Sequence, residues 1–207
     1  MKYMPEKMVA ASRYSAYVHT LPEELRRQLI FRMNELIQEE REFCDRGNYK
    51  HMSQIITALA LYDVLMDKGF SEEETARIVT EEMWNALDAA PMKRLAEKRF
   101  FFPLMQKLIP LGFKFGSGAG WRYTWHKEKR KDIFRFDCNE CIYAKIFGKR
   151  GLLNIGKAFC HADIINYNEL PYIEFQRTGT LCRGDRRCDF VFIRHTEEDG
   201  WDRSKSV

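Results

Sequence analysis

The sequence lacks any apolar run long enough to cross a membrane, and it lacks an apolar segment near its start. The longest apolar stretch, residues 100–113, is interrupted by Pro103, Lys107 and Pro110, whereas a membrane-spanning helix needs about 20 apolar residues. Residues 1–10 contain no apolar core of the kind that a secretory signal requires. We therefore expect a cytoplasmic protein with no membrane partner, whose cysteines are reduced.

The chain also lacks a strong excess of either charge. It has 34 Lys and Arg against 30 Asp and Glu, for a net charge of +4. Because the basic residues are scattered among the acidic ones, we expect no nucleic-acid partner. Two short basic patches, residues 127–131 and 183–187, coincide with predicted turns and are interpreted as solvated hairpin tips. With 45% hydrophobic residues, the chain has enough apolar material for a folded core.

Common metal and nucleotide motifs are missing as well. The sequence has no H-E-x-x-H helix and no Walker-type phosphate loop. Cys138 and Cys141 form a C-x-x-C pair, but five residues separate Cys182 from Cys188, which is wider than usual for a four-thiolate zinc site. We therefore assign no metal ligand and expect no cofactor, and zinc is kept as the alternative.

The first half of the chain is patterned as helices. Two capping boxes, Thr20 with Glu23 and Ser71 with Glu74, indicate helix starts. Apolar residues then recur at helical spacing in three stretches, which are residues 25–37, 55–66 and 78–87.

A fourth helix is expected over residues 92–109, with a kink at Pro103. The glycines between residues 112 and 120 then predict a flexible connection. We place the boundary there, between a helical region (residues 1–115) and an α+β region (residues 116–207) that carries the candidate site. The two regions can also pack as one compact domain.

Beyond Gly120 the pattern changes to that of strands. Aromatic and polar residues alternate, as they do in a half-buried strand. The order strand-strand-helix-strand-strand, with hairpin connections, predicts a small antiparallel sheet packed on helices, and hence an α+β fold. The expected strands are residues 121–125, 133–138, 172–181 and 188–195, and the expected helices are residues 140–147 and 152–167.

The candidate chemistry centres on cysteine and aspartate in the last third of the chain. Cys160 and Asp163 are three residues apart on a predicted helix, so they share one face. A neighbouring base or cation would lower the pKa of the thiol and make it nucleophilic. The alternative interpretation is that Cys160 is a core residue, as free cysteines commonly are, and that Asp163 is a surface group.

Arg177 is expected beside Phe175 on the core-leaning side of its strand. Arginine is seldom buried without a partner. A carboxylate is the natural one, and Asp163, Asp189 or a ligand could supply it. The alternative is an edge position from which the guanidinium reaches water.

Four short motifs of this chain occur in the order known from one family. They are a C-x-Y element, a C-x-x-D helix, an R-T-x-T strand and a G-x-x-x-C-D-F strand. Together they resemble the L-2-amino-thiazoline-4-carboxylic acid hydrolase family over roughly residues 120–194, whereas the helical half carries no matching motif. In this chain they stand at Cys141 to Tyr143, Cys160 to Asp163, Arg177 to Thr180 and Gly184 to Phe190.

The resemblance implies a small-molecule substrate and a ring-opening hydrolysis, which converts a 2-amino-thiazoline-4-carboxylate-like compound into an N-carbamoyl-cysteine-like product. Our hypothesis gives the nucleophile role to Cys160 or Cys188, either through a covalent adduct or by positioning water. Asp163 would be the acid–base group, with a pKa raised by burial. Arg177 would bind the substrate carboxylate or hold Asp163 in place. The other substrate-binding residues would be Cys141, Thr180 and Asp189.

Two other classes of function stay open. The layout is also similar to vinyl-reductase-like domains, which would bind a small molecule or a metal through the same cysteines without catalysis. The second class is an interaction protein that uses the segment from Phe100 to Phe113 as its partner surface. That class predicts a homo-oligomer that the substitution Phe101→Asp disrupts.

Overall fold

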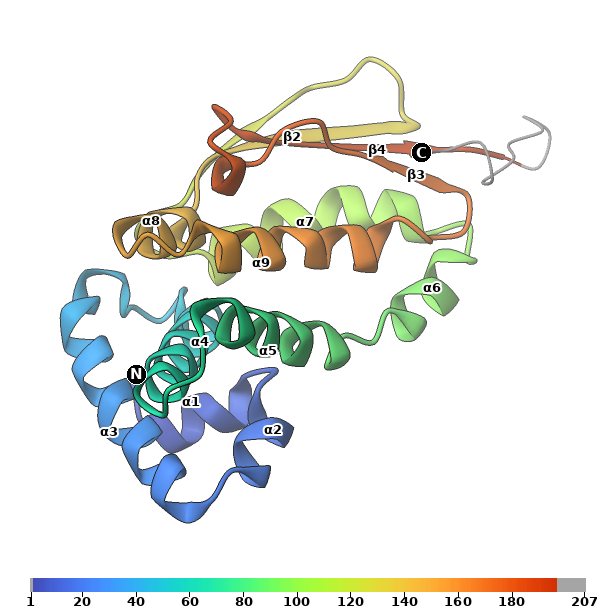
Figure 1. The fold of residues 1–207 in the computed structure, drawn as a ribbon. Coiled ribbons are helices and arrows are strands. Elements are labelled where there is room, and N and C mark those ends of the chain that lie inside the picture. The colour runs from blue at the N-terminus through green and yellow to red at the C-terminus, as the bar shows by residue number, and fades with distance from the viewer. Residues whose placement is uncertain (1, 197–207) are drawn as a thin grey trace.

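The structure is a computed structural model that describes residues 2–196, and it has a helical part followed by a four-stranded sheet backed by helices (Figure 1). This confirms the predicted α+β class and the order of strands and helices in the second half. The α-helices of the described residues are α1 (Pro5–Ala11), α2 (Ser15–Thr20), α3 (Glu23–Glu39), α4 (Tyr49–Asp67), α5 (Glu72–Asn85), α6 (Ala90–Ala96), α7 (Phe101–Gly116), α8 (Ile142–Lys149) and α9 (Leu153–Tyr167). The strands are β1 (Arg122–Trp125), β2 (Ile133–Glu140), β3 (Ile173–Gln176) and β4 (Cys188–Arg194), and two 3-10 turns are η1 (Arg41–Phe43) and η2 (Leu181–Arg183).

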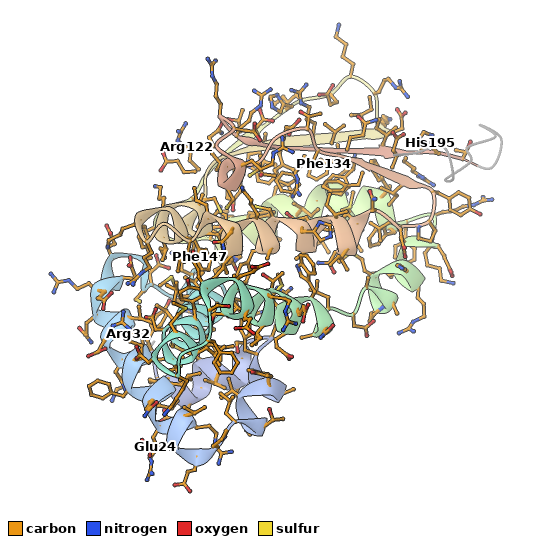
Figure 2. All side chains as sticks on the ribbon, viewed as in Figure 1. Glu24, Arg32, Arg122, Phe134, Phe147 and His195 are labelled. Carbon is orange, nitrogen blue, oxygen red and sulfur yellow. The ribbon has the colours of Figure 1, made fainter. Side chains whose placement is uncertain are left out.

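Helix α4 lies at the centre of the helical part. Apolar residues surround it on all sides, and a helix of that kind is stable only when other elements enclose it. Helices α1, α3 and α5 pack around it. Ile142 and Phe147 of α8 and Ile155 of α9 join the same core cluster, and Phe147 points towards the helical part (Figure 2). Residues on both sides of position 116 thus share one core, while the division at that position stays a prediction.

The sheet has the strand order β1-β2-β4-β3, and every neighbouring pair is antiparallel. Helices α7 and α9 lie along the same face of it (Figure 1). Phe134 and Phe192 face this layer and form a second core cluster with Phe102 of α7. The register of β2 with β4 sets Cys138 opposite Cys188, so the pairing of these strands brings two of the distant cysteines together.

One of the two predicted capping boxes is confirmed. The Ser71 hydroxyl accepts from the backbone N–H of Glu74, whose carboxylate accepts from the backbone N–H of Ser71. The prediction for Thr20 is wrong, because Thr20 is the last residue of α2 and its hydroxyl donates to the carbonyl of Tyr17. Helix α3 begins after Pro22 without a side-chain cap.

The prediction of one kinked helix over residues 92–109 is also wrong. The chain forms α6 and α7 instead, and α7 continues to Gly116. Pro103 lies in the first turn of α7, where its missing N–H removes no helical hydrogen bond. The glycines at 112 and 116 are helical, so the connection to the sheet is confined to residues 117–121.

The strand expected over residues 172–181 ends at Gln176. Beyond it, Asp189 accepts hydrogen bonds from the backbone N–H groups of Thr178, at 3.0 Å, and Gly179, at 2.6 Å. Because a side chain takes these two donors, residues 177–180 leave the ladder and form a loop.

The connection between α7 and β1 is held by side chains from the loop before α4. Asn48 is fully buried and its amide oxygen accepts from Gly118 N–H and from the Trp121 indole, both at 2.9 Å. Its amide nitrogen donates to the carbonyl of Ala119 at 2.9 Å. Asp45 accepts from Ala119 N–H at 2.7 Å. A Cβ on Gly118 would lie 1.9 Å from the Asp45 carboxylate, so only glycine fits there.

We expect Asn48→Ala to destabilise the protein by about 3 kcal/mol, since it leaves several buried donors and acceptors without partners. The free energy of unfolding from urea titration measures this loss. The matched control is Asn34→Ala on α3, where an exposed amide donates to the carbonyl of Ile30. Equal stability of the two variants would contradict a structural role for Asn48.

Candidate active site

Arg177 forms an ion pair with Asp163 in the layer between α9 and the sheet. One guanidinium nitrogen donates to Asp163 Oδ2 at 2.7 Å and another to the carbonyl of Cys160 at 2.9 Å. The rings of Phe175 and Phe190 lie 5.8 and 5.6 Å from the guanidinium carbon. Only 5% of the Arg177 side chain is exposed. Of the partners considered from the sequence, Asp163 is therefore the one that Arg177 contacts, and the edge position is excluded.

Asp163 is surrounded by protein atoms, but its side chain remains partly accessible to solvent. Burial raises the pKa of its carboxyl group to about 6, and the opposing charge of Arg177 does not offset that effect. At the same time, 33% of its side chain remains accessible. A carboxyl group in this position can donate or accept a proton near neutral pH.

The thiol of Cys160 lies beside that of Cys182 from η2. Glycine at position 156 of α9 permits this approach, because a Cβ there would lie 3.0 Å from Cys182 Sγ. The hydrogen bond from Cys182 lowers the pKa of Cys160, and so does the charge of Arg177, against the effect of burial. Cys182 is 1% exposed and its pKa is raised. Cys160 is partly exposed. Of this pair, Cys160 is the cysteine whose pKa favours the thiolate form.

A second group of thiols comes from three elements: Cys138 from β2, Cys141 from the start of α8 and Cys188 from β4. Cys188 Sγ accepts from the backbone N–H of Leu181 at 3.3 Å. The hydrogen bond from Cys138 and the charge of Arg177 lower the pKa of Cys188, whereas the pKa of Cys138 is raised. Cys188 is 6% exposed, so it is less accessible than Cys160.

The absence of a metal cofactor stays a prediction, with zinc as its alternative. No group of three or more His, Cys, Asp or Glu side chains within residues 2–196 has an arrangement that could hold a metal ion. The donor sets are two neighbouring groups of thiols, whereas a structural zinc ion needs four ligands in a tetrahedron.

The other substrate-binding residues predicted from the sequence are Asp189, Thr180 and Cys141, and their side chains differ in their contacts within residues 2–196. Both Asp189 oxygens accept hydrogen bonds from the loop at Thr178, which lower its pKa although burial raises it. Asp189 thus orders the loop that follows Arg177. Thr180 is 6% exposed, and its hydroxyl has no partner in residues 2–196. Cys141 is the N-cap residue of α8. A substrate contact for any of them stays a prediction.

Arg13, in the turn between α1 and α2, was not indicated by the sequence. Its backbone N–H donates to the side chain of Gln54 on α4 at 3.0 Å, which fixes the turn against that helix. Its charge lowers the pKa values of Asp163 and Tyr143, so the guanidinium lies within electrostatic range of both. Within residues 2–196 no ion pair or hydrogen bond engages this guanidinium. No local signal marks it, because more than a hundred residues separate it from Asp163.

His51 of α4 and Tyr143 of α8 were also missed, although Tyr143 belongs to the C-x-Y motif. The His51 ring lies 3.2 Å from the Tyr143 hydroxyl through Nδ1, and it packs against the Trp121 ring at 4.9 Å. Burial lowers the pKa of His51 to about 4, so the ring is neutral at physiological pH. Burial raises the pKa of Tyr143, and the nearby acidic groups of Cys141, Asp163 and Cys160 add to that effect.

One surface hollow of the described chain is lined by Ser117, Trp121 and Tyr123, and the last two also pack against the thiols of Cys138 and Cys141. Three further hollows lie elsewhere on the described chain. None of the four hollows has Cys160 or Asp163 in its lining. Cys160 and Asp163 are themselves partly exposed.

The comparison with known proteins agrees with the motifs. The family model described as L-2-amino-thiazoline-4-carboxylic acid hydrolase matches residues 48–192. No curated protein and no solved structure matches the chain. The matched range contains Cys160, Asp163, Arg177 and Cys188, whereas Arg13 lies outside it.

We expect Arg177→Met to destabilise the protein by about 2 to 3 kcal/mol at pH 8, because it leaves the buried Asp163 carboxylate without its partner. The loss should shrink at pH 5, since the pKa of Asp163 rises further without Arg177 and the neutral acid costs little to bury. The double variant Arg177→Met, Asp163→Asn should recover part of the loss. Chemical denaturation at both pH values measures these differences.

The control is Arg77→Met, which breaks an exposed pair with Glu81 on α5 and should change stability by less than about 0.5 kcal/mol. A loss in Arg177→Met that is independent of pH and unaffected by Asp163→Asn would contradict the coupling.

Proposed function

Because the chain belongs to the L-2-amino-thiazoline-4-carboxylic acid hydrolase family, we propose that it hydrolyses a small ring with an amidine-like carbon and a carboxylate substituent. The observation that carries this proposal is the placement of Cys160 and Asp163 on one face of α9 with Arg177 bound to both. A thiol of lowered pKa beside a carboxyl group that titrates near pH 6 supplies a nucleophile and a proton donor.

Cys160 is the proposed nucleophile, because it is more exposed than Cys188 and adjoins Asp163. Its thiolate adds to the ring carbon between sulfur and nitrogen, and the carbon–sulfur bond of the ring breaks. The departing sulfur takes the proton of Asp163 and becomes a free thiol. The substrate is then held on Cys160 through a new carbon–sulfur bond.

Water completes the cycle. It adds to the same carbon, gives one proton to the Asp163 carboxylate and the other to the amidine nitrogen, and displaces the Cys160 thiolate. One water molecule is consumed, and the product carries a carbamoyl group and a thiol. In a variant of this mechanism, Cys160 and Asp163 position a water molecule that attacks the ring carbon directly, and no covalent adduct with Cys160 forms.

Arg13 is the proposed receptor for the substrate carboxylate. Arg177 already donates to Asp163 and to the backbone of Cys160, so its role is to position these groups. Arg13 has no such partner in the described chain and lies within electrostatic range of Asp163. The neutral His51 ring and the Tyr143 hydroxyl add uncharged hydrogen-bonding groups on the same side.

We expect Cys160→Ala to lower kcat for 2-amino-thiazoline-4-carboxylate by at least about a thousandfold, and Asp163→Asn by at least about a hundredfold. Release of the product thiol, followed with a thiol reagent, measures turnover. Circular dichroism checks folding. Cys44→Ala is the control, since Cys44 lies in the helical part and burial raises its pKa.

Full turnover in Cys160→Ala together with loss in Cys188→Ala would transfer the nucleophile role to Cys188. Full turnover in both would remove the thiol mechanism. Saturable binding of the compound by the unaltered protein without any thiol release would instead favour the alternative of a ligand-binding domain similar to vinyl-reductase-like domains.

We expect Arg13→Met to raise KM for the same substrate by about tenfold or more while kcat changes little, because a carboxylate contact made equally in ground and transition state affects binding alone. Arg13→Lys should retain part of the affinity, since it keeps the charge. Arg46→Met, at an exposed position before α4, is the control. An unchanged KM in Arg13→Met would contradict the assignment.

A further inference from the structure

Helix α7 exposes a continuous line of large apolar side chains. The spacing of four, four, three and four residues places them on one side of the helix. Single exposed apolar residues are ordinary on protein surfaces, but a connected row of five is not. The row, which we call the α7 ridge, consists of Phe100 (58% exposed), Leu104 (37%), Leu108 (50%), Leu111 (49%) and Phe115 (71%).

The opposite side of α7 supplies the packing that holds the helix in place. Phe101, Phe102 and Met105 are buried in the core cluster beneath the sheet. The core contacts of α7 therefore come from this buried side, and the ridge lies at the surface. This also corrects the substitution proposed from the sequence, since Phe101 is 7% exposed and Phe101→Asp would disturb the core rather than the surface.

The charged residues of the segment that carries the ridge have one sign. From Lys98 to Lys127 the sequence contains no Asp or Glu. Lys107 and Lys114, two turns apart, are exposed and lie along one border of the ridge. Neither lysine forms an ion pair within residues 2–196. Lys98 and Arg99 precede Phe100 and add positive charge at the start of the ridge.

We propose that the α7 ridge binds the surface of an anionic lipid bilayer, with the helix lying in the plane of the interface. The apolar side chains would enter the boundary between headgroups and acyl chains, and the lysines would meet lipid phosphates. No helix of residues 2–196 is both long and apolar enough to span a bilayer. Our expectation of no membrane partner rested on the lack of such spans, whereas this contact is peripheral.

Charge complementarity favours a lipid surface over a second copy of this chain. In a symmetric dimer each ridge would face its own counterpart, which brings Lys107 and Lys114 close to like charges. The segment contains no acidic residue that could compensate them. An anionic bilayer supplies the opposite charge along the whole border, together with an apolar layer that suits a protruding ridge.

The test is co-sedimentation of the full chain with vesicles of phosphatidylcholine and with vesicles of an equimolar mixture of phosphatidylcholine and phosphatidylglycerol. We expect binding to the mixture to exceed binding to phosphatidylcholine by at least about tenfold, and to weaken as salt is added. The double variants Leu108→Asp, Leu111→Asp and Lys107→Glu, Lys114→Glu should each lose at least about tenfold in affinity.

The control is Phe31→Asp, which removes an exposed aromatic side chain (67%) from α3 and should bind as the unaltered protein does. Thermal melts establish that all variants are folded. Equal binding by the ridge variants, or no binding to either vesicle, overturns the proposal. So does a dimer in light scattering that Leu108→Asp, Leu111→Asp dissolves, since it would assign the ridge to a second copy.

Discussion

The buried guanidinium of Arg177 is the constraint on which the candidate site depends. A cation with 5% of its surface exposed requires a partner, and Asp163 is the carboxylate within reach. The second donor binds the carbonyl of Cys160. The pair therefore ties the loop after β3 to helix α9 and fixes the positions of the thiol and the carboxyl group relative to each other. Asp189 supports the arrangement from the other side by ordering that loop.

The same cation also acts on the protonation of the proposed reactive groups. Burial raises the pKa values of both Asp163 and Cys160. Arg177 opposes both effects, because its charge lowers the pKa values of Asp163, Cys160 and Cys188. The outcome is a carboxyl group that titrates near pH 6 beside a thiol with a lowered pKa. Removing the cation would cost stability and would raise the pKa of Asp163, while the hydrogen bond from Cys182 would still lower the pKa of Cys160.

Local patterns made the α+β class and the placement of Cys160 and Asp163 on one helix face predictable. The spacing of Cys160 and Asp163 follows from helical geometry, and strand alternation with hairpin connections gives the antiparallel sheet. Features that depend on distant partners were not predictable. The loop at residues 177–180 forms because Asp189 accepts hydrogen bonds from its backbone donors, and α7 continues to Gly116 while its buried side packs in the core beneath the sheet. Arg13 lies near Asp163 because the complete fold brings the turn after α1 towards α9.

If Arg13 binds the substrate carboxylate as proposed, catalysis and substrate binding are assigned to different parts of the chain. The groups that would break and form bonds lie within residues 48–192, the range that matches the family. The proposed carboxylate receptor comes from the turn after α1, outside that range, and Gln54 of α4 holds it in place. Asn48, at the start of α4, binds the connection between α7 and β1. The same helix therefore contacts both the turn that carries Arg13 and the connection that leads into the sheet. In this arrangement, substitutions in the turn between α1 and α2 can alter which carboxylate substrate is bound, while the thiol and the carboxyl group of α9 stay unchanged.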